Sequence, residues 1–446
     1  MSPILEVSTE KTRLHFPTIR RLPNGLTVIA EQMPIDAVNL SLWLKVGSAA
    51  EPDAINGVAH FLEHMIFKGT PRIPSGEFER LVEERGAVTN AATSQDYTHF
   101  YITGAPQDFA TLAPIHIDLV MNPCIDGQDF ERERPVILEE IRRSRSNPNR
   151  RNFQRSMEMA FEQLPYRRQV LGPEAVIQQL TPATMRAFHR HWYQPQNITA
   201  VAVGNLPVND LVATVAEGFE QAIAHRSQLQ AQPTETSARD ASTFGLPHFP
   251  EPLSEQPFQD IYRIHHTDAS LQQACLQLTW RVPGLTQLEQ TYALDVVASI
   301  LGHGRTARLV RDLRENRQWV SGVGANNLTY DRQGIFSISA RLEVEHLSDV
   351  EAAIVAHIQT LASEGVTDDE LRRVQTQVAN RYIFGSEAPS DRAGLYGYYQ
   401  TMTGNLEHAL NYPAEIQALT VDDLQGAVQR FLPSNAYGVM TICPET

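Results

Sequence analysis

The sequence predicts an α+β fold in which one unit of strands and helices is used twice. At 446 residues the chain is longer than one hydrophobic core usually serves. Residues 180–203 give a helix, a Pro-Gln-Asn turn and a strand, and residues 419–442 repeat this order with Pro-Ser-Asn in the turn. Residues 224–257 are rich in Pro, Ser, Gln and Thr without periodicity, which is typical of a linker. We therefore expect one domain at 1–223 and a second at 258–446.

Strands dominate the start of the first half. An Asn-Gly pair at 24–25 predicts a hairpin between strands at 19–22 and 26–30. Residues 38–46 alternate apolar and polar in part, as a half-buried strand does. The Thr-rich and aromatic stretch 86–101 predicts two more strands around a turn.

Helices fill the remainder of that half, and the second half begins with a similar order. Periodicity and capping signals predict helices at 57–69, 75–85, 107–121, 129–146, 152–162, 182–191 and 207–223. After the linker, a strand is expected at 274–282, a helix at 292–301 and a closing strand at 437–442. The helix at 292–301 corresponds to the one at 57–69 but carries no histidine, so only the first half can hold a metal there.

Composition excludes several classes of protein. Asp and Glu number 52 against 37 for Lys and Arg, giving a net charge of −15, which argues against nucleic-acid binding. No apolar run is long enough for a membrane span, and the first residues carry charges where a signal peptide needs an apolar core, so we expect a cytoplasmic protein. Cys124, Cys275 and Cys443 are far apart and predict neither a disulfide framework nor a cysteine metal site.

The stretch GVAHFLEHMIFKGT at 57–70 contains the residues that could bind a metal ion and transfer a proton. His60, Glu63 and His64 share one face of the predicted helix. Two imidazoles at that spacing can hold zinc, and the carboxylate is then placed to take a proton from water. H-x-x-E-H is the signature of inverted zinc proteases.

A catalytic zinc needs a third protein ligand, and the helix at 129–146 offers one. Glu133 and Glu140 lie nearly two turns apart and share a face, from which Glu139 is rotated by roughly 100°. We predict Glu140 as the ligand and Glu133 as a carboxylate that orients a ligand. Pro135 could instead mark the first turn of the helix, which would weaken the argument for Glu133 but not for Glu140.

With these residues in place, the sequence resembles the pitrilysin-type inverzincin peptidases, most closely the branch of the mitochondrial processing peptidase and its short bacterial forms. The matching motifs are Glu51 followed by 57–70, then NAATS at 90–94 and VILEEI at 136–141. The family's spacing between the second histidine and the third ligand also identifies Glu140. The match extends over most of the chain and is more specific in the first half.

The resemblance implies a fold, a cofactor and an activity. Each unit would be a mainly antiparallel sheet with helices packed on one face. His60, His64 and Glu140 would bind one Zn²⁺ per chain, in the first domain. Glu63 would be the general base that takes a proton from water and hands it to the leaving amine. The protein would be a zinc metalloendopeptidase that cleaves short or unfolded peptides in a clam-like chamber, of which this chain forms half.

Substrate contacts and a partner follow from the same resemblance. Asn90, Ala91 and Ala92 would lie on an edge strand that pairs with extended peptide. Family members that complete the site from the second half carry an Arg followed by a Tyr. Here the Arg is Arg314, but Ser321 stands at the Tyr position. Our hypothesis is a second family chain that is zinc-free and carries an intact Arg/Tyr pair, the alternative being a homodimer.

Other interpretations remain open from sequence. The chain could be a presequence-type processing peptidase subunit, or a non-catalytic structural subunit of the same fold, although a scaffold has no need for all four zinc-site residues. Glu133 and Arg314 could be solvated helix charges, and Asn90 a turn residue. The aromatic stretch 395–400 with Arg392 favours core packing or partner contact over a substrate role.

Overall fold

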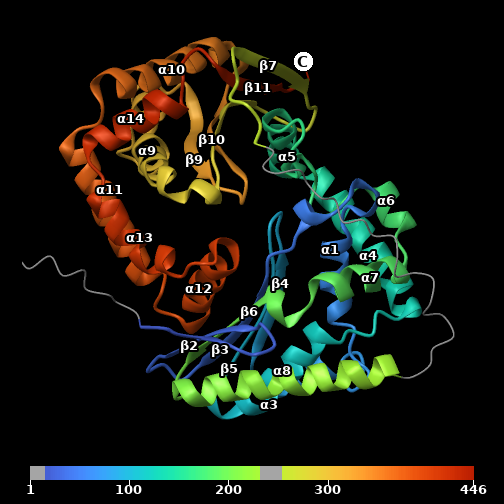
Figure 1. The fold of residues 1–446 in the computed structure, drawn as a ribbon. Helices are drawn as coiled ribbons and strands as arrows, with labels where there is room; N and C mark the ends of the chain where they lie inside the picture. The colour runs from blue at the N-terminus through green and yellow to red at the C-terminus, as the bar shows by residue number, and fades with distance from the viewer. Residues whose placement is uncertain (1–15, 232–253, 446) are drawn as a thin grey trace, which may run out of the picture.

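The computed structural model describes residues 16–231 and 254–445, which build two sheets with helices packed against them (Figure 1). The first sheet has the strand order β1 (Thr18–Arg21), β2 (Thr27–Gln32), β6 (Ile198–Gly204), β3 (Val38–Leu44), β5 (Thr98–Gly104), β4 (Val88–Thr93). The second has the order β7 (Ile261–Thr267), β11 (Tyr437–Cys443), β8 (Ala274–Pro283), β10 (Gln333–Leu342), β9 (Val320–Leu328).

The two sheets have the same topology once the short β1 is set aside. In each, the order is first, fifth, second, fourth and third strand of that half. The pairs β2/β6 and β7/β11 are parallel, and every other pair of neighbours is antiparallel. The prediction of two related, mainly antiparallel αβ units is therefore confirmed.

Helices of the first half are α1 (Val58–Ile66), α2 (Glu77–Glu84), α3 (Phe109–Met121), α4 (Gly127–Ser146), α5 (Pro148–Ala160), α6 (Glu174–Gln179), α7 (Pro182–Trp192) and α8 (Val208–Ala231). Those of the second are α9 (Tyr292–Gly302), α10 (Leu347–Glu364), α11 (Asp368–Phe384), α12 (Pro389–Thr403), α13 (Glu407–Ala418) and α14 (Val421–Phe431), with a π-helical segment at Val310–Asn316. No helix in the described ranges is long and apolar enough to cross a bilayer.

The helix predicted to end near residue 223 continues to Ala231, so the start of the expected 224–257 linker is helical. Tertiary contacts explain the difference. Arg226 donates to the carbonyl oxygens of Met121 and Tyr193, and these anchors extend the helix through a polar stretch. Residues 232–253 of that linker lie outside the described residues, and the domain boundaries remain a prediction.

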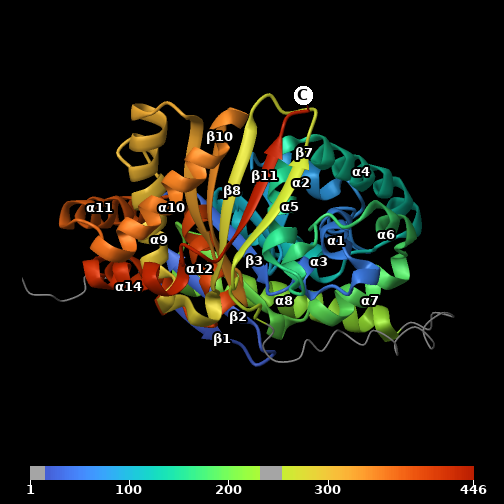
Figure 2. The ribbon, with the colours of Figure 1, turned by 90° about the horizontal axis from the view of Figure 1, so that it is seen from above.

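Each half also covers the second face of the other half's sheet (Figures 1 and 2). Helix α12 lies on the first sheet, where Tyr396 packs in a cluster with Ile29, Trp43 and Val201. Helix α5 lies on the second sheet, where its Met159 packs beside β11. All residues of β3 and β6 are buried as a result.

A buried polar contact fixes α12 on the first sheet. Tyr396 donates its hydroxyl to Glu31 at 2.6 Å, and Arg392 donates to the other oxygen of that carboxylate at 3.2 Å. Core packing, one of the two roles expected for this aromatic stretch, is what Tyr396 provides.

Candidate metal centre

Helix α1 presents its polar residues to one side because its other side is needed for the core. Six of its nine residues are buried: Val58, Ala59, Phe61, Leu62, Met65 and Ile66. The remaining three are His60, Glu63 and His64, which follow at helical spacing on the opposite side. The apolar face therefore fixes the orientation of the helix on the core, and the candidate metal-site residues lie on the opposite, polar face.

The start of α1 is held by a buried carboxylate. Glu51 accepts hydrogen bonds from the amides of Gly57 and Ala59, both at 2.7 Å, and so satisfies donors of the first turn that lack a partner in the helix. Gly57 has φ of 99°, and a Cβ there would lie 2.6 Å from the carbonyl oxygen of Leu171. Only glycine fits both the backbone conformation and the space.

Helix α4 carries the carboxylates and packs directly on α1. Phe61 of α1 stacks on Phe130 of α4 with ring centroids 4.5 Å apart, and both rings are fully buried. Pro135 lies inside α4, whose N-cap is Asp126, so the alternative in which Pro135 starts the helix is wrong. Glu133 and Glu140 are therefore on one continuous helix, as the spacing argument required.

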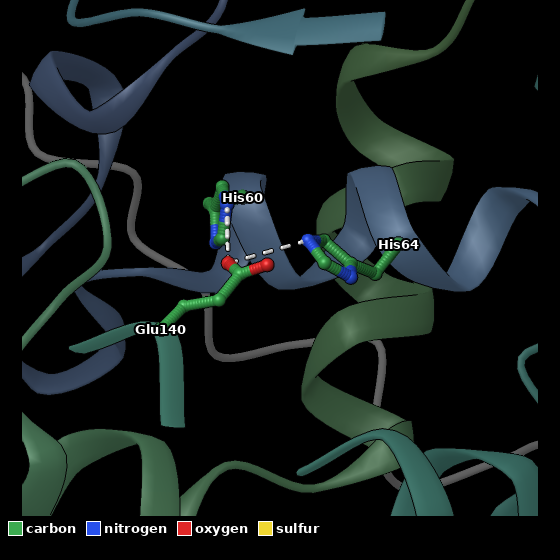
Figure 3. A group of neighbouring side chains, drawn as sticks. All are labelled: His60, His64 and Glu140. Carbon is green, nitrogen blue, oxygen red and sulfur yellow. Dashed lines mark ion pairs between the residues drawn. The ribbon is translucent and has the colours of Figure 1, made fainter. Parts of the chain in front are cut away.

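Three side chains converge between these helices (Figure 3). One carboxylate oxygen of Glu140 lies 3.5 Å from His60 Nε2 and 3.6 Å from His64 Nε2. Within the described part of the chain, His60, His64 and Glu140 are the one group of His, Cys, Asp or Glu whose ligand atoms are arranged to hold a metal, all within 4.8 Å of one another. Burial, together with the neighbouring His64, lowers the pKa of His60 to about 3, so that imidazole is neutral and able to act as a ligand.

Glu133 orients His64 through the ring nitrogen that is not directed at Glu140. His64 Nδ1 lies 2.9 Å from Glu133 Oε1, and Lys68 Nζ lies 2.6 Å from Glu133 Oε2. Burial alone would raise the pKa of Glu133, but the hydrogen bonds and charges of Lys68 and His64 outweigh it and hold that pKa below its usual value. Glu133 is therefore an ionised acceptor, the proton lies on Nδ1, and Nε2 keeps its lone pair for a metal.

Glu63 lies on the same face, beside the edge of the first sheet. Its Oε2 accepts a hydrogen bond from the Thr93 hydroxyl at the end of β4. Burial raises the pKa of Glu63 above its usual value, and the Thr93 hydrogen bond opposes part of that shift. A carboxyl group with a raised pKa is suited to taking and returning a proton near neutral pH.

The donor set fits zinc. Two neutral imidazoles and one carboxylate match the ligand type and number of catalytic zinc sites. A bound zinc ion would act as a Lewis acid toward a peptide carbonyl and toward water. A catalytic site also needs space beside the ligands. A cavity of about 600 Å³ provides it, and this cavity is lined by His60, Glu63 and Glu140 together with Ala92 and Thr93 of β4.

The predicted substrate-binding residues lie in two separate places, on β4 and in the second half of the chain. Asn90, Ala91 and Ala92 lie on β4, which is the edge strand of the first sheet. Ala92 lines the cavity, while Asn90 Oδ1 accepts from the Ala91 amide. Arg314 lies in the second half, where it pairs with Glu315 at 2.6 Å.

No described residue of the second half lines the cavity beside the ligands. Ser321 is the exposed second residue of β9 and donates its hydroxyl to Gln273. Within this chain the structure therefore does not bring Arg314 or Ser321 to the metal ligands, and their roles stay predictions.

Three residues that hold the site were not assigned a role from the sequence. Thr93 belonged to the NAATS motif, but nothing in the sequence showed that its hydroxyl reaches Glu63. Lys68 follows His64 at helical spacing, which hinted at a shared face but not at Glu133. Glu51 belonged to a motif, yet nothing in the sequence showed that its carboxylate turns back onto the start of α1.

Two of the other histidines have ordinary structural surroundings. His189 Nε2 lies 2.9 Å from the carbonyl oxygen of Val120 in the core, and burial lowers the pKa of His189 to about 3. His265 Nδ1 lies 2.9 Å from the hydroxyl of Thr441 on the neighbouring strand. Neither residue belongs to the ligand group found among the described residues.

The fold and the three metal-donor side chains together resemble those of a metallopeptidase, and two protein-family models match this chain. The model described as insulinase, peptidase family M16, matches residues 26–174, and the model described as the peptidase M16 inactive domain matches residues 179–378. The chain belongs to the pitrilysin-type peptidase family M16. The first match contains all of His60, His64 and Glu140, and the second contains none of them.

Full-length relatives are named as zinc proteases. An uncharacterized zinc protease of Mycobacterium tuberculosis is 27% identical over 432 residues, which cover 96% of this chain and 93% of that one. The zinc protease PqqE of Helicobacter pylori is 26% identical over 415 residues, covering 90% of this chain and 87% of its own.

Solved structures share the fold. A protease from Helicobacter pylori superposes with a TM-score of 0.84 at 23% identity, covering 96% of this chain and all of that one (100%). The periplasmic protease PqqL from Escherichia coli gives a TM-score of 0.75 at 20% identity, covering 97% of this chain but 48% of that chain. One chain of this fold thus corresponds to about half of the longer protein. The cytoplasmic location stays a prediction, since a periplasmic protein has the same fold.

Proposed function

We propose that this chain is a zinc-dependent endopeptidase that cleaves short or unfolded peptides inside a dimeric chamber. The observation that carries the proposal is the convergence of His60, His64 and Glu140 beside the partly buried Glu63, next to an edge strand. A structural subunit would not need this set, and the relatives named as zinc proteases support zinc as the metal. One zinc per chain follows from the single ligand group within the described residues.

The chain's own residues supply positioning and proton transfer. Glu63 takes a proton from the attacking water and returns it to the leaving amine, because burial raises its pKa and makes it a stronger proton acceptor than an ordinary carboxylate. Thr93 holds the Glu63 carboxylate in place through its hydroxyl. Strand β4 binds an extended peptide by main-chain hydrogen bonds, for which Asn90, Ala91 and Ala92 provide the free edge, so affinity depends little on peptide sequence.

The chamber needs a second chain. Among the described residues, those lining the cavity beside the ligands come from the first half alone, which leaves the far side of a bound peptide open. The match to half of the longer PqqL supports pairing of two such chains. We propose a zinc-free family member with the Arg/Tyr pair as the partner, since Ser321 stands where the Tyr is expected. If the purified chain alone forms a homodimer that cleaves peptides at full rate, the hetero-dimer is wrong.

Replacing Glu63 by Gln tests the mechanism. The native complex carrying Glu63→Gln should retain its metal and lose peptide cleavage by at least about hundredfold, because the general base is gone while the ligands remain. The matched control is Glu84→Gln at the end of α2, whose side chain is 53% exposed and does not line the cavity beside the ligands, and it should cleave at the wild-type rate. Cleavage by Glu63→Gln at the wild-type rate would remove Glu63 from the mechanism.

Two rival functions predict other results. A non-catalytic structural subunit is favoured by the match of residues 179–378 to a domain described as inactive, and it predicts clearly less than one zinc per chain in a native preparation. A presequence-type processing peptidase predicts one dominant cleavage site in each substrate. Mass spectrometry of the products from several unrelated peptides separates it from the endopeptidase proposed above.

A further inference from the structure

Arginines gather beside the metal ligands in a chain whose net charge is −15. The face of α4 that carries Glu140 continues at helical spacing through Arg143 to Asn147, and Arg150 follows in the first turn of α5. Arg143, Asn147 and Arg150 all line the cavity beside the ligands. The carboxylates in that lining are Glu63 and Glu140, which the proposed function already occupies.

This cavity continues into a second one. Asn147, Arg150, Val170 and Leu171 line both, and the second has a volume of about 590 Å³. Its charged lining residues are five arginines and one glutamate: Arg145, Arg150, Arg151, Arg155, Arg168 and Glu158. The route away from the metal ligands on this side therefore has a strong excess of positive charge.

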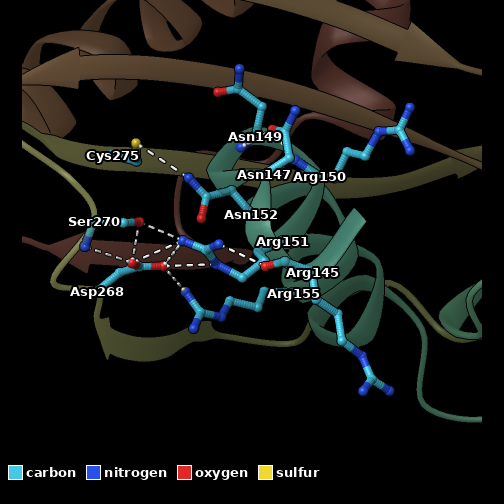
Figure 4. A network of polar contacts seen from close by, with 10 residues as sticks. All are labelled: Arg145, Asn147, Asn149, Arg150, Arg151, Asn152, Arg155, Asp268, Ser270 and Cys275. Atoms are coloured by element: carbon cyan, nitrogen blue, oxygen red, sulfur yellow. Dashed lines mark hydrogen bonds and ion pairs between the residues drawn. The ribbon is translucent and has the colours of Figure 1, made fainter. Parts of the chain in front are cut away.

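Most of these arginines already form ion pairs with carboxylates of the described residues, and Arg150 is the one that does not (Figure 4). Arg151 makes a bidentate contact with Asp268, which Arg155 also approaches at 3.5 Å. Arg145 lies 3.5 Å from Glu174, and Arg168 lies 2.8 Å from Asp53. The contacts of Arg151 and Arg155 with Asp268 hold α5 against the second half, and together the pairs occupy the nearby carboxylates.

Arg150 has no such partner. Its side chain is exposed, no described side chain pairs with it, and in Figure 4 its guanidinium extends away from the network around Asp268. Arg143 is nearly as available, because it makes one long contact of 3.3 Å with the exposed Glu139 and is itself 77% exposed. Two guanidinium groups are thus directed to the cavity where a bound peptide would pass.

We propose that this site selects peptides that carry a carboxylate next to the scissile bond, and that Arg150, assisted by Arg143, binds it. The proposal rests on the proposed function and names its substrate class. A guanidinium binds a carboxylate through two parallel hydrogen bonds, which adds direction to the charge attraction. The carboxylate can be an Asp or Glu side chain or the C-terminus of a short peptide. A basic segment would meet like charge in the same place.

The test measures binding to the Glu63→Gln variant, which holds peptides without cleaving them, in the full chain with any partner that co-purifies. Fluorescently labelled peptides differ only by Asp or Glu against Asn or Gln at central positions, and each is made with a free and with an amidated C-terminus. We expect about fivefold to tenfold tighter binding of the acidic peptides, with a smaller ratio at high salt. A ratio that depends on the free C-terminus alone assigns the contact to the terminal carboxylate.

Variants of exposed arginines make the assignment specific. Adding Arg150→Gln should bring the ratio of acidic to neutral affinity close to one, and Arg150→Glu should favour a peptide with Lys at the same position. The matched control is Arg132→Gln at the other end of α4, whose side chain is 74% exposed and pairs with Asp129. That control should keep the full ratio.

The inference and the proposed function fail in different ways. Binding that changes with neither the central carboxylate nor the free C-terminus, or an unchanged ratio in Arg150→Gln, overturns the inference even if wild-type protein cleaves neutral peptides in a zinc-dependent way. Acidic preference in binding without cleavage of any peptide by the wild-type complex overturns the peptidase and leaves the binding site standing.

Discussion

His64 Nδ1 lies 2.9 Å from Glu133 Oε1, so a carboxylate on α4 fixes the ring of a ligand on α1. Glu133 is in turn held by Lys68 at 2.6 Å. This arrangement makes the proton position on His64 a property of the fold rather than of the bound metal.

Glu133→Gln should weaken zinc binding by about tenfold to hundredfold, because the neutral amide orients His64 less firmly and makes it a weaker donor to the metal. Competition with a calibrated chelator measures the change. Glu131→Gln, two residues earlier on the exposed side of α4 where Glu131 pairs with Arg134, is the control and should bind zinc as wild type does. Equal affinity in both variants would show that Glu133 has no influence on the metal.

Phe130 links the stability of the chain to the geometry of the site. Its ring is fully buried against Phe61, so Phe130→Ala should lower the free energy of unfolding by about 3–5 kcal/mol. It should also weaken zinc binding, since the helix carrying Glu140 loses its fixed position against α1. Urea unfolding of the metal-free protein separates the two effects.

Val136→Ala on the same helix is the control for Phe130, because Val136 is 44% exposed and should cost less than about 1 kcal/mol. If Phe130→Ala lowers stability by that amount and leaves zinc affinity unchanged, the packing of these two rings does not position Glu140.

Glu51 gives the chain a dependence of stability on pH. Burial raises the pKa of Glu51 to about 7, although the amides of Ala59 and Gly57 oppose the shift. The folded protein therefore binds a proton between about pH 4.5 and 7 that the unfolded chain releases, so this group's contribution to stability is lost as pH rises through that interval.

We expect the stability difference between wild type and Glu51→Gln to change by a few kcal/mol between pH 5 and pH 8, in the direction that disfavours wild type at pH 8. Urea unfolding at the two pH values measures it, with the metal removed so that ligand titration does not contribute. Parallel pH profiles for the two proteins would rule out titration of Glu51 in this range.

The cluster of His60, His64 and Glu140 could be predicted because it depends on local periodicity. His60, Glu63 and His64 share a helix face by spacing alone, and Glu140 follows from helical geometry on a second segment with clear capping signals. The duplication of the αβ unit could be predicted because similar turn residues, Pro-Gln-Asn and Pro-Ser-Asn, recur at the end of both halves. In each case, the prediction depends on residues that lie close together in the sequence.

Contacts between distant segments could not be predicted in this way. The apolar side of α12 shows that the helix packs on something, but its sequence does not say that Tyr396 reaches Glu31 in the other half. Polar residues such as Arg226 look like loop residues until their carbonyl partners are known. Arg143 and Arg150 likewise become a site only when α4 and α5 place them beside the ligands.

The central claim is that two helices assemble one zinc site, with Glu140 rather than its neighbour as the third ligand. The most direct measurement is the zinc content of purified wild type, Glu140→Gln and Glu139→Gln. The account predicts one zinc per chain for wild type and for Glu139→Gln, whose side chain is half exposed and pairs with Arg142 and Arg143, and loss of zinc in Glu140→Gln. Full zinc content in Glu140→Gln, or its loss in Glu139→Gln, would contradict it.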